Sequence, residues 1–437
     1  MQTKLHAPAR PSWVARLPFF HGWIILFVAA LGMFASGPGQ TFGISVFVDP
    51  IIEDLGWSRT LVSGLYTAGS LTAATAMILV GRLLDRHGAR VMLFSVAVLF
   101  GLAALGMGRI AAPIHLYLGF VALRMLGQGS LTLVSTTLVA IWFRRLRGRA
   151  TAIAALAMPA SQAAFPVLIY ALVSTVGWRN AWTVLAFVIW GLLLIPTLVL
   201  VRRSPESVGL SPDGDPTSQT SEEVAALLGS ADEPDFTLGE ALRARSFWLL
   251  LFAGSSFSLI GTALTFHHIS LMTTQGIGAG LAATVLSMVA PAALGGTLAA
   301  GYLTDKISNR YPLVAAQGLL AVAMVLAISI EAPWTALTYG VVLGFGQGLM
   351  MTTNVVIWPN YFGRTHLGAI RGAVTTAMVA FAALGPFPFG VLFDVGGSYT
   401  LAVLVFLAMP VACGAAAYMA VPPRKPSAAR PPSAREA

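Results

Sequence analysis

The chain has 437 residues, of which 57% are hydrophobic and only 10% are charged. Water-soluble domains carry about 25% Asp, Glu, Lys and Arg, so this composition excludes a soluble enzyme and predicts a membrane protein. The net charge of +9 does not indicate a nucleic-acid partner, because no basic segment is interleaved with aromatic residues. The single cysteine, Cys413, excludes an intrachain disulfide and a thiolate metal site.

Apolar stretches long enough to cross a bilayer follow one another along the chain. A transmembrane helix needs about 20 mostly apolar residues, and this criterion predicts twelve spans and an all-α membrane fold. Barrel strands are excluded, because the stretches are too long and do not alternate in polarity. The predicted spans are 22–48, 58–81, 90–108, 114–141, 149–174, 179–201, 246–272, 280–303, 311–330, 334–359, 368–392 and 398–420.

The positive charges favour one side of the predicted membrane. Of the 26 Lys and Arg residues, only Arg59, Arg109 and Arg179 fall in loops on the opposite side, and Arg124 falls inside a span. Lys and Arg concentrate in the cytoplasmic loops of membrane proteins. We therefore expect a multi-pass protein of the plasma membrane, the inner membrane of a bacterium, with both termini in the cytoplasm.

A change of composition divides the chain after the sixth span. Residues 202–245 hold more than half of the 17 acidic residues, together with Ser, Pro and Gly. Such a segment is typical of a flexible linker, here with one short amphipathic helix near 236–242. The predicted domains are an N-terminal six-helix bundle, a cytoplasmic linker, a C-terminal six-helix bundle and a cytoplasmic tail, at 1–201, 202–245, 246–421 and 422–437.

Residues of the two predicted bundles match at one nearly constant spacing. Internal repeats in a helical membrane protein indicate a transporter with its site between the repeats, so we expect two pseudo-symmetric bundles. The matching pairs are Gly81 and Gly301, Asp85 and Asp305, Arg86 and Lys306, Arg90 and Arg310, Gln128 and Gln347, and Pro166 and Pro386.

The loop after the second span reads G-x-x-x-D-R-x-G-x-R, and a related loop follows span eight. This doubled motif resembles the signature loop of the major facilitator superfamily, which implies two six-helix bundles and transport by alternating access. An acid at a cytoplasmic helix end can pair with basic groups across the interface of the halves, which would form a gate. The alternative is a positively charged turn whose glycines only permit tight packing. The expected gating residues are Gly81, Asp85, Arg86, Arg90, Gly301, Asp305, Lys306 and Arg310.

Further motifs are similar to bacterial members of the monocarboxylate porter branch of that superfamily. They include Gly22-Trp23, the segment from Asp49 to Arg59, Arg147-Gly148-Arg149 and Trp178-Arg179. The similarity implies proton-coupled or exchange transport of a small organic anion. Members of the branch usually carry a basic residue in span eight, often with a Lys in span one or eleven. In this chain span eight has no Lys or Arg, and spans one and eleven have no Lys, so the similarity does not name the substrate.

Arg124 is the only Lys, Arg, Asp or Glu predicted deep inside a span. A charge at the centre of a membrane helix costs about 2.5–3.5 kcal/mol on insertion scales, so this side chain needs a partner or a wet cavity. The resemblance places span four along the central cavity. We expect the guanidinium of Arg124 to bind a carboxylate of the substrate. The alternative is an arginine held by backbone carbonyls at a helix break, with a structural role only.

His267 and His268 lie near the outer end of span seven. An imidazole can bind and release a proton near neutral pH, which suits proton coupling in a bundle without an intramembrane carboxylate. Neighbouring helical residues point about 100° apart, so at most one of the two faces the cavity directly. We expect the proton site at one of them. The alternative is a histidine hydrogen-bonded near the lipid interface.

Neutral polar residues inside the spans can orient a ligand once water is excluded. The aromatic residues Tyr66, Phe266, Trp358 and Phe387 are expected to shape an apolar wall. For each such residue the alternative is a role in helix packing. The expected substrate-binding amides are Gln40, Gln128, Gln347 and Asn354.

No phosphate-binding G-x-x-x-x-G-K, zinc-binding H-E-x-x-H or nucleophile G-x-S-x-G motif occurs. We therefore expect no enzyme activity, no cofactor and no metal. The predicted function is that of a monomeric secondary transporter, with a small organic anion, protons and the lipid bilayer as its partners. One alternative is a proton-coupled exporter of amphipathic or neutral molecules, in which Arg124 is structural. Another is a sensor or assembly factor that does not transport.

Overall fold

The computed structural model describes residues 19–208, 210–211, 213, 236–363 and 366–423. Within these residues the regular structure is helical and contains no strand, as the sequence predicts. Most of the predicted linker, and the predicted tail from residue 424 onward, lie outside the described residues.

The helices before the linker are α1 Gly22–Ala35, η2 Gly37–Gly39, α2 Thr41–Leu55, α3 Arg59–His87, α4 Ala89–Met107, α5 Pro113–Leu123, η3 Arg124–Leu131, α6 Thr132–Trp142, α7 Arg147–Ala155, α8 Ala157–Leu200 and η4 Glu206–Val208. Those after it are α10 Leu238–Arg243, α11 Arg245–Ser256, η6 Phe257–Gly261, α12 Thr262–Phe266, α13 His268–Thr273, α14 Ala279–Lys306, α15 Arg310–Ile328, α16 Pro333–Phe362, α17 Leu367–Leu384, α18 Pro386–Gly396 and α19 Tyr399–Met419.

Eleven helical segments of the described chain are long and apolar enough to cross a membrane. One of them, Gly148–Leu200, has 53 residues. At about 1.5 Å per residue it is more than twice as long as the hydrocarbon core of about 30 Å. Gly177 interrupts it with a φ of 79°, a conformation that favours glycine. The predicted spans 149–174 and 179–201 are therefore two crossings joined at this bend, and twelve crossings result.

Spans one, four and seven are interrupted, although we predicted them as continuous helices. In span one the Gly37-Pro38-Gly39 turn of η2 separates α1 from α2, because proline cannot donate the helical hydrogen bond. Spans four and seven contain the π-helical segments η3 and η6. π-Helical turns are frequent at functional sites, and interrupted helices surround the binding sites of many transporters. The three interruptions therefore mark the region in which a site is expected.

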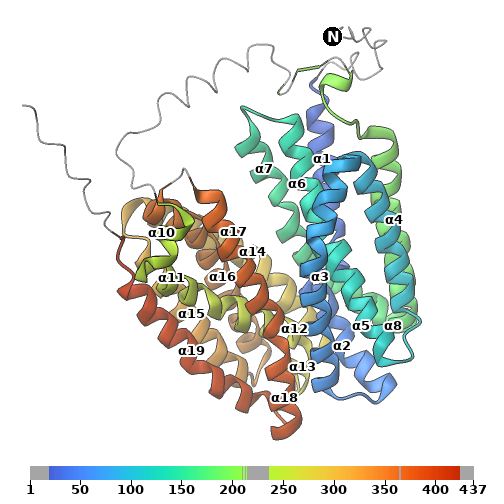
Figure 1. Cartoon of the computed structure of the whole chain (residues 1–437). Coiled ribbons are helices and arrows are strands. Elements are labelled where there is room, and N and C mark those ends of the chain that lie inside the picture. The colour runs from blue at the N-terminus through green and yellow to red at the C-terminus, as the bar shows by residue number, and fades with distance from the viewer. Residues whose placement is uncertain (1–18, 209, 212, 214–235, 364–365, 424–437) are drawn as a thin grey trace, which may run out of the picture.

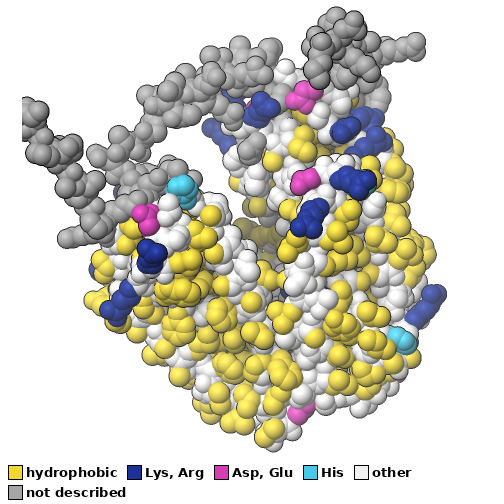
Figure 2. All heavy atoms as spheres, in the orientation of Figure 1, with side chains coloured by type: hydrophobic (Ala, Val, Ile, Leu, Met, Phe, Trp, Pro, Cys, Tyr) yellow, Lys and Arg dark blue, Asp and Glu magenta, His cyan; other side chains and the backbone are white. Residues whose placement is uncertain are grey.

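Helices α1 to α8, here called the N-half, and α10 to α19, the C-half, form two groups that meet at one end and separate toward the other (Figure 1). Between the halves, α2, α3 and α8 contact α12, α13, α14, α17 and α18. We call the end at which α3 begins the closed end. At the other end, here the basic end, Lys and Arg gather and a hollow opens between the halves (Figure 2).

Large apolar side chains cover the outer wall of the molecule (Figure 2). Ile195 on α8 is 67% exposed and Leu298 on α14 is 75% exposed. Contiguous apolar surface of this extent is unfavourable in water, and the acyl chains of a bilayer solvate it instead. The chain is therefore a multi-pass membrane protein.

Candidate functional site

Arg124 begins the π-helical segment η3 and is buried, with 8% of its surface exposed. Its Nη1 donates a hydrogen bond of 3.2 Å to the hydroxyl of Thr41, and its guanidinium carbon lies 5.1 Å from the centre of the Tyr66 ring. Within the described residues, no carboxylate forms an ion pair with it. A guanidinium has five N–H donors, and a single hydrogen bond uses one of them. The positive charge of Arg124 is not balanced by a carboxylate of the described residues.

The three residues form a small polar group where spans one, two and four meet. The hydroxyls of Thr41 and Tyr66 are 2.7 Å apart and share a hydrogen bond. The ring of Tyr66 packs against that of Phe266, with centroids 4.5 Å apart, and these rings belong to opposite halves. Of the four aromatic residues expected to shape an apolar wall, Tyr66 and Phe266 thus form a contact between the halves, whereas Trp358 packs against Phe247 and Phe362 within the C-half. The contact between the halves lies next to Arg124.

The local sequence explains why η3 departs from an α-helix and brings Arg124 to this place. The hydroxyl of Ser130 donates to the carbonyl of Met125, five residues earlier, at 2.7 Å. Gly39 lies against this segment so closely that a Cβ there would be 2.5 Å from the carbonyl oxygen of Leu123 and 3.0 Å from the Cα of Gly127. Glycines on both helices thus allow the interrupted parts of spans one and four to touch beside Arg124.

The four predicted amides do not all join this group. Gln40 is buried, and its amide donates to the hydroxyl of Ser36 at 3.0 Å. Gln128 and Gln347 are half-buried, and neither side chain hydrogen-bonds to another residue that the structure describes. The side-chain oxygen of Asn354 accepts a bond of 2.7 Å from the indole of Trp358, one turn further along α16. Gln128 and Gln347 therefore keep their amides available, whereas Gln40 and Asn354 have partners.

The two histidines have different environments, because the helix breaks between them. His267, the residue after α12, has φ −91° and ψ 8°, and α13 begins at His268. The Nε2 of His267 donates to the carbonyl of Pro386 at 2.9 Å, which leaves Nδ1 to accept a bond of 3.0 Å from the hydroxyl of Tyr399. His267 therefore fits the neutral form with its proton on Nε2.

His268 points into the C-half. Its Nε2 donates to the carbonyl of Ala282 at 3.1 Å, and its ring stacks on Tyr339 with centroids 5.6 Å apart. Its Nδ1 is buried without a partner among the described residues. Of the two predicted proton sites, only His267 contacts the polar residues near the interface of the halves.

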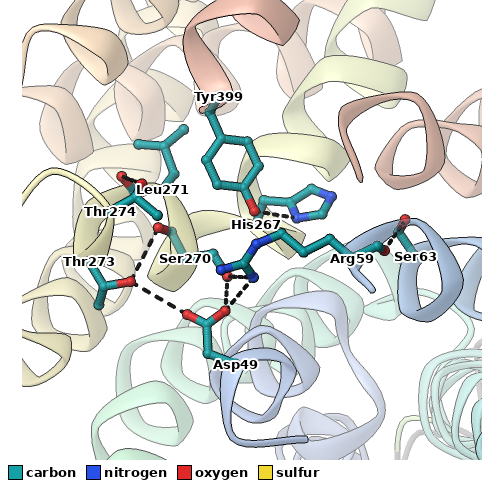
Figure 3. Close-up of polar contacts among 9 residues, drawn as sticks. All are labelled: Asp49, Arg59, Ser63, His267, Ser270, Leu271, Thr273, Thr274 and Tyr399. Atoms are coloured by element: carbon teal, nitrogen blue, oxygen red, sulfur yellow. Dashed lines mark hydrogen bonds and ion pairs between the residues drawn. The ribbon is translucent and has the colours of Figure 1, made fainter. Parts of the chain in front are cut away.

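At the closed end, a polar cluster joins the two halves (Figure 3). Arg59 of α3 pairs with Asp49 of α2 at 2.5 Å and donates to the hydroxyl of Ser270 at 2.9 Å. The hydroxyls of Ser270 and Thr273, both on α13, donate to the two carboxylate oxygens of Asp49. The guanidinium of Arg59 also lies 4.5 Å from the ring centre of Phe393. We call Asp49, Arg59, Ser270 and Thr273 the closed-end latch.

Sequence reasoning missed the latch as a functional unit. Asp49 and Arg59 were noted only as part of a family resemblance and, for Arg59, as a basic residue on the side opposite the cytoplasm, since charged residues near the ends of spans are common. Two further bonds join the halves in this region: the amide of Thr60 donates to Asp394 at 2.8 Å, and the hydroxyl of Thr67 donates to the carbonyl of Ala383 at 2.7 Å. A short polar sequence between two spans, with an acid and an arginine, is the signal that could have indicated the latch.

The predicted gating residues lie at the basic end, where the halves are apart. In the described part of the chain, the exposed acids Asp85 and Asp305 make no ion pair. Arg90 donates instead to the carbonyl of Leu198 at 2.9 Å, within the N-half. Arg310 contacts Tyr311 and Tyr418, within the C-half. The remaining gating residues, Gly81, Arg86, Gly301 and Lys306, lie on α3 and α14 in the same region. The described residues thus show no pairing of the gating residues across the halves at this end, and the gating role stays a prediction.

The family model of the Major Facilitator Superfamily matches residues 22–330 and 269–437. The chain belongs to this superfamily. It is 24% identical to the probable sulfoacetate transporter SauU of Cupriavidus necator over 376 residues, 83% of this chain and 85% of that protein. It is 25% identical to the probable L-galactonate transporter of Escherichia coli over 403 residues, 84% of this chain and 82% of that protein. It is 24% identical to the MFS transporter asaE of Aspergillus flavus over 327 residues, 74% and 69% of the two chains.

Solved structures share the fold of this major facilitator. A D-xylose-proton symporter superposes with a TM-score of 0.69 and 17% identity, covering 92% of this chain and 98% of that chain. A bacterial homolog of the human lysosomal transporter Spinster, in an inward-facing and unoccupied conformation, gives a TM-score of 0.68 and 15% identity over 92% and 95% of the two chains. The superfamily predicted from the doubled loop is confirmed, and the chain is a small-molecule transporter. The monocarboxylate porter branch stays a prediction.

Proposed function

We propose that this transporter moves a small organic anion across the plasma membrane, the inner membrane of a bacterium, by alternating access. The observation that carries the proposal is the buried guanidinium of Arg124, which has one neutral hydrogen bond and no acidic partner among the described residues. A carboxylate or sulfonate would neutralise its charge through charge-assisted hydrogen bonds. Sulfoacetate and galactonate, which appear in the names of two relatives, are both organic anions.

The arrangement of the halves supports an inward-open state in this proposal. Lys and Arg gather at the basic end (Figure 2), which by the positive-inside rule faces the cytoplasm. The hollow between the halves then opens to the cytoplasm, and the closed-end latch and the Tyr66–Phe266 contact seal the outer side. An anion would enter the hollow and bind Arg124, with Gln128 of the N-half and Gln347 of the C-half as orienting amides. The transporter acts as a monomer of two six-helix bundles, with both termini in the cytoplasm.

Proton coupling is assigned in this proposal to His267 rather than His268. The Nδ1 of neutral His267 accepts the hydroxyl of Tyr399, and the Tyr399 ring centre lies 6.0 Å from the guanidinium of Arg59. Protonation of Nδ1 would turn this acceptor into a donor, so the Tyr399 hydroxyl would have to accept this bond and direct its own hydrogen elsewhere beside the latch. A proton at His267 would in this way favour opening of the closed end. His268 has no comparable contact with the latch.

A second candidate is the export of amphipathic or neutral molecules. One observation favours it: Thr41 and the face of Tyr66 partly satisfy Arg124, as expected of an arginine with a structural role. Arg124 would then hold spans one, two and four together, and the aromatic rings beside it would contact an apolar substrate.

Uptake and binding by the purified protein distinguish the two functions. In proteoliposomes with an inward-directed proton gradient, the panel is sulfoacetate, galactonate, pyruvate and lactate, with xylose as the neutral solute. We expect at least one anion to be transported, and Arg124→Gln to lower its binding about tenfold or more, as for the loss of a hydrogen bond to a charged group. Arg124→Lys should retain part of the binding. Arg109→Gln, which removes an exposed arginine, serves as the charge control. Transport of a neutral solute alone, or unchanged anion transport by Arg124→Gln, would establish the second candidate.

A further inference from the structure

The first turn of α11 borders a groove at the basic end of the C-half. The groove has a volume of about 290 Å³, and it runs between α11 and the end of α19. Its polar part lies in the first turn of α11, and its apolar part comes from both helices. The lining residues are Arg245, Ser246, Leu249, Met419 and Val421.

The polar part of this groove is suited to an anion. α11 begins at Arg245 after Ala244, no side chain of the described residues caps the helix, and its first turn contains no acidic residue. The first N–H groups of a helix lack intrahelical acceptors, and together with the helix dipole they attract negative charge. Arg245 adds a full positive charge at the same place. The N-terminus of α11 and a cation thus lie at the residues that line one side of the groove.

The hydroxyl of Ser246 provides an independent sign of a missing ligand. Ser246 is only 6% exposed, and its Oγ is buried without a hydrogen-bond partner among the residues that the structure describes. Buried hydroxyl groups in proteins are nearly always hydrogen-bonded. Because Ser246 lines the groove, a phosphate oxygen at the N-terminus of α11 would supply the acceptor that it lacks.

The level of the groove relative to the lipid headgroups indicates a lipid as the source of this phosphate. Trp248, in the first turn of α11, is 55% exposed and donates through its indole to the carbonyl of Leu242 at 2.8 Å. Exposed tryptophans of membrane proteins concentrate at the level of the lipid headgroups. Leu249, Met419 and Val421 continue the groove with apolar surface, which a free phosphate cannot use. We propose that this groove binds a phospholipid with an anionic headgroup.

In this site the phosphate lies at the N-terminus of α11, accepts the hydroxyl of Ser246 and pairs with Arg245. One acyl chain follows the apolar wall formed by Leu249, Met419 and Val421. The lipid would hold the ends of α11 and α19 together at the basic end. The site lies apart from Arg124, and the inference does not depend on which molecule the transporter carries.

Lipid titration of the full chain in detergent, followed by native mass spectrometry, tests the proposal. The probes are dioleoylphosphatidylglycerol, dioleoylphosphatidylcholine and inorganic phosphate. We expect phosphatidylglycerol to bind more tightly than phosphatidylcholine, and the double variant Arg245→Gln/Ser246→Ala to lower its affinity about tenfold or more, since hydrogen bonds to charged groups are lost. The matched control Arg243→Gln removes an exposed arginine that does not line the groove, and it should change the affinity by less than about twofold.

Variants that fill the groove test the acyl chain separately. Leu249→Trp and Val421→Trp leave Arg245 and Ser246 in place. Val421 is exposed just after α19, so Val421→Trp does not disturb the core. Both should weaken phosphatidylglycerol binding while the protein keeps its thermal unfolding temperature. Equal affinity for the two lipids, or unchanged binding by the double variant, would overturn the proposal. Displacement of the lipid by millimolar phosphate, with no effect of either tryptophan, would show a site for free anions and equally overturn it.

Discussion

Arg59 and Ser270 are 211 positions apart in the chain, yet the guanidinium of Arg59 donates to the hydroxyl of Ser270 at 2.9 Å. The same hydroxyl donates to Asp49, so Ser270 bridges both members of an ion pair (Figure 3). Arg59 and Asp49 belong to the N-half and Ser270 to the C-half. Their pairing persists when the halves separate, whereas the bonds to Ser270 must break. Ser270, which contacts both charged groups, is therefore together with Thr273 the part of the latch that depends on the conformational state.

Replacing Ser270 with alanine should shift the protein toward states in which the two halves are separated at the closed end. The substitution removes the hydroxyl that contacts both charged groups, and a hydrogen bond to a charged group contributes about 1.5–3 kcal/mol. The ratio of open to closed molecules should therefore rise about tenfold or more. Spin labels attached to cysteines that replace Glu53 and Val395, exposed residues of α2 and α18, would report the separation of the halves by double electron–electron resonance.

Thr274→Ala is the matched control for this experiment. Thr274 lies four residues further along the same segment, and its hydroxyl donates only to the carbonyl of Leu271 within that segment. Its loss should leave the distance distribution as in the parent. Identical distributions for Ser270→Ala and the parent would mean that the latch does not hold the closed end.

Replacing Gly39 with alanine should destabilise the protein and impair transport together. An added Cβ would lie 2.5 Å from the carbonyl oxygen of Leu123, so span one must move away from the segment that begins at Arg124. Overpacking of this kind costs about 1–3 kcal/mol. Thermal unfolding in detergent and anion uptake measure the two effects.

The control substitution for Gly39 is Gly106→Ala, because a Cβ at Gly106 meets no atom within 4 Å. This variant should unfold at the temperature of the parent or slightly above, since alanine favours helix. If Gly39→Ala were as stable and active as the control, the close contact between spans one and four would not position Arg124.

The architecture could be predicted from the sequence. Single functional residues were easier to predict than the residues that they contact. Span lengths, the positive-inside pattern and the doubled loop depend on composition and short motifs, which one chain displays. Arg124 was found because a charge inside a span is rare. Its contacts with Thr41 and Tyr66 follow from the interruptions of spans one and four, and regular helical spacing gives no sign of these interruptions.

The latch and the gating motif show a second limit of sequence reasoning. Ser270 is one serine among many, and only the packing of the halves brings it to Asp49. The pairing expected for Asp85 and Asp305 would require a state in which the basic end is closed, and the structure describes a single conformation in which this end is open. A separation of about 100° between His267 and His268 requires a regular helix, whereas the chain breaks at His267.

Asp213→Ala should loosen the attachment of the linker to the N-half. The carboxylate of Asp213 accepts three backbone bonds just before α7, from the amides of Arg144, Arg145 and Leu146, at 3.0, 2.7 and 3.2 Å. Hydrogen exchange followed by mass spectrometry should show faster exchange of these amides, by about tenfold or more, because each bond has a charged acceptor.

The control for the linker attachment is Glu206→Ala, which removes an exposed acid of η4. It changes the net charge equally and should leave the exchange of residues 144–146 as in the parent. Equal acceleration in both variants would assign the effect to charge rather than to the three bonds of Asp213.

His21, the residue before the first span, should make stability depend on pH. Burial lowers the pKa of His21 below its ordinary value of 6.5; the bond to the carbonyl of Leu200 opposes this shift, and the charge of Arg202 adds to it. The unfolded chain therefore binds a proton at a higher pH than the folded chain. The stabilising contribution of His21 is complete above pH 6.5 and is lost as the pH falls through the lower folded pKa.

His21→Gln, whose amide can still donate to Leu200, should reduce the fall of the unfolding temperature between about pH 7 and about pH 5. His115→Gln, at an exposed histidine, should follow the parent, and a His21→Gln curve parallel to the parent would exclude His21 as the titrating group.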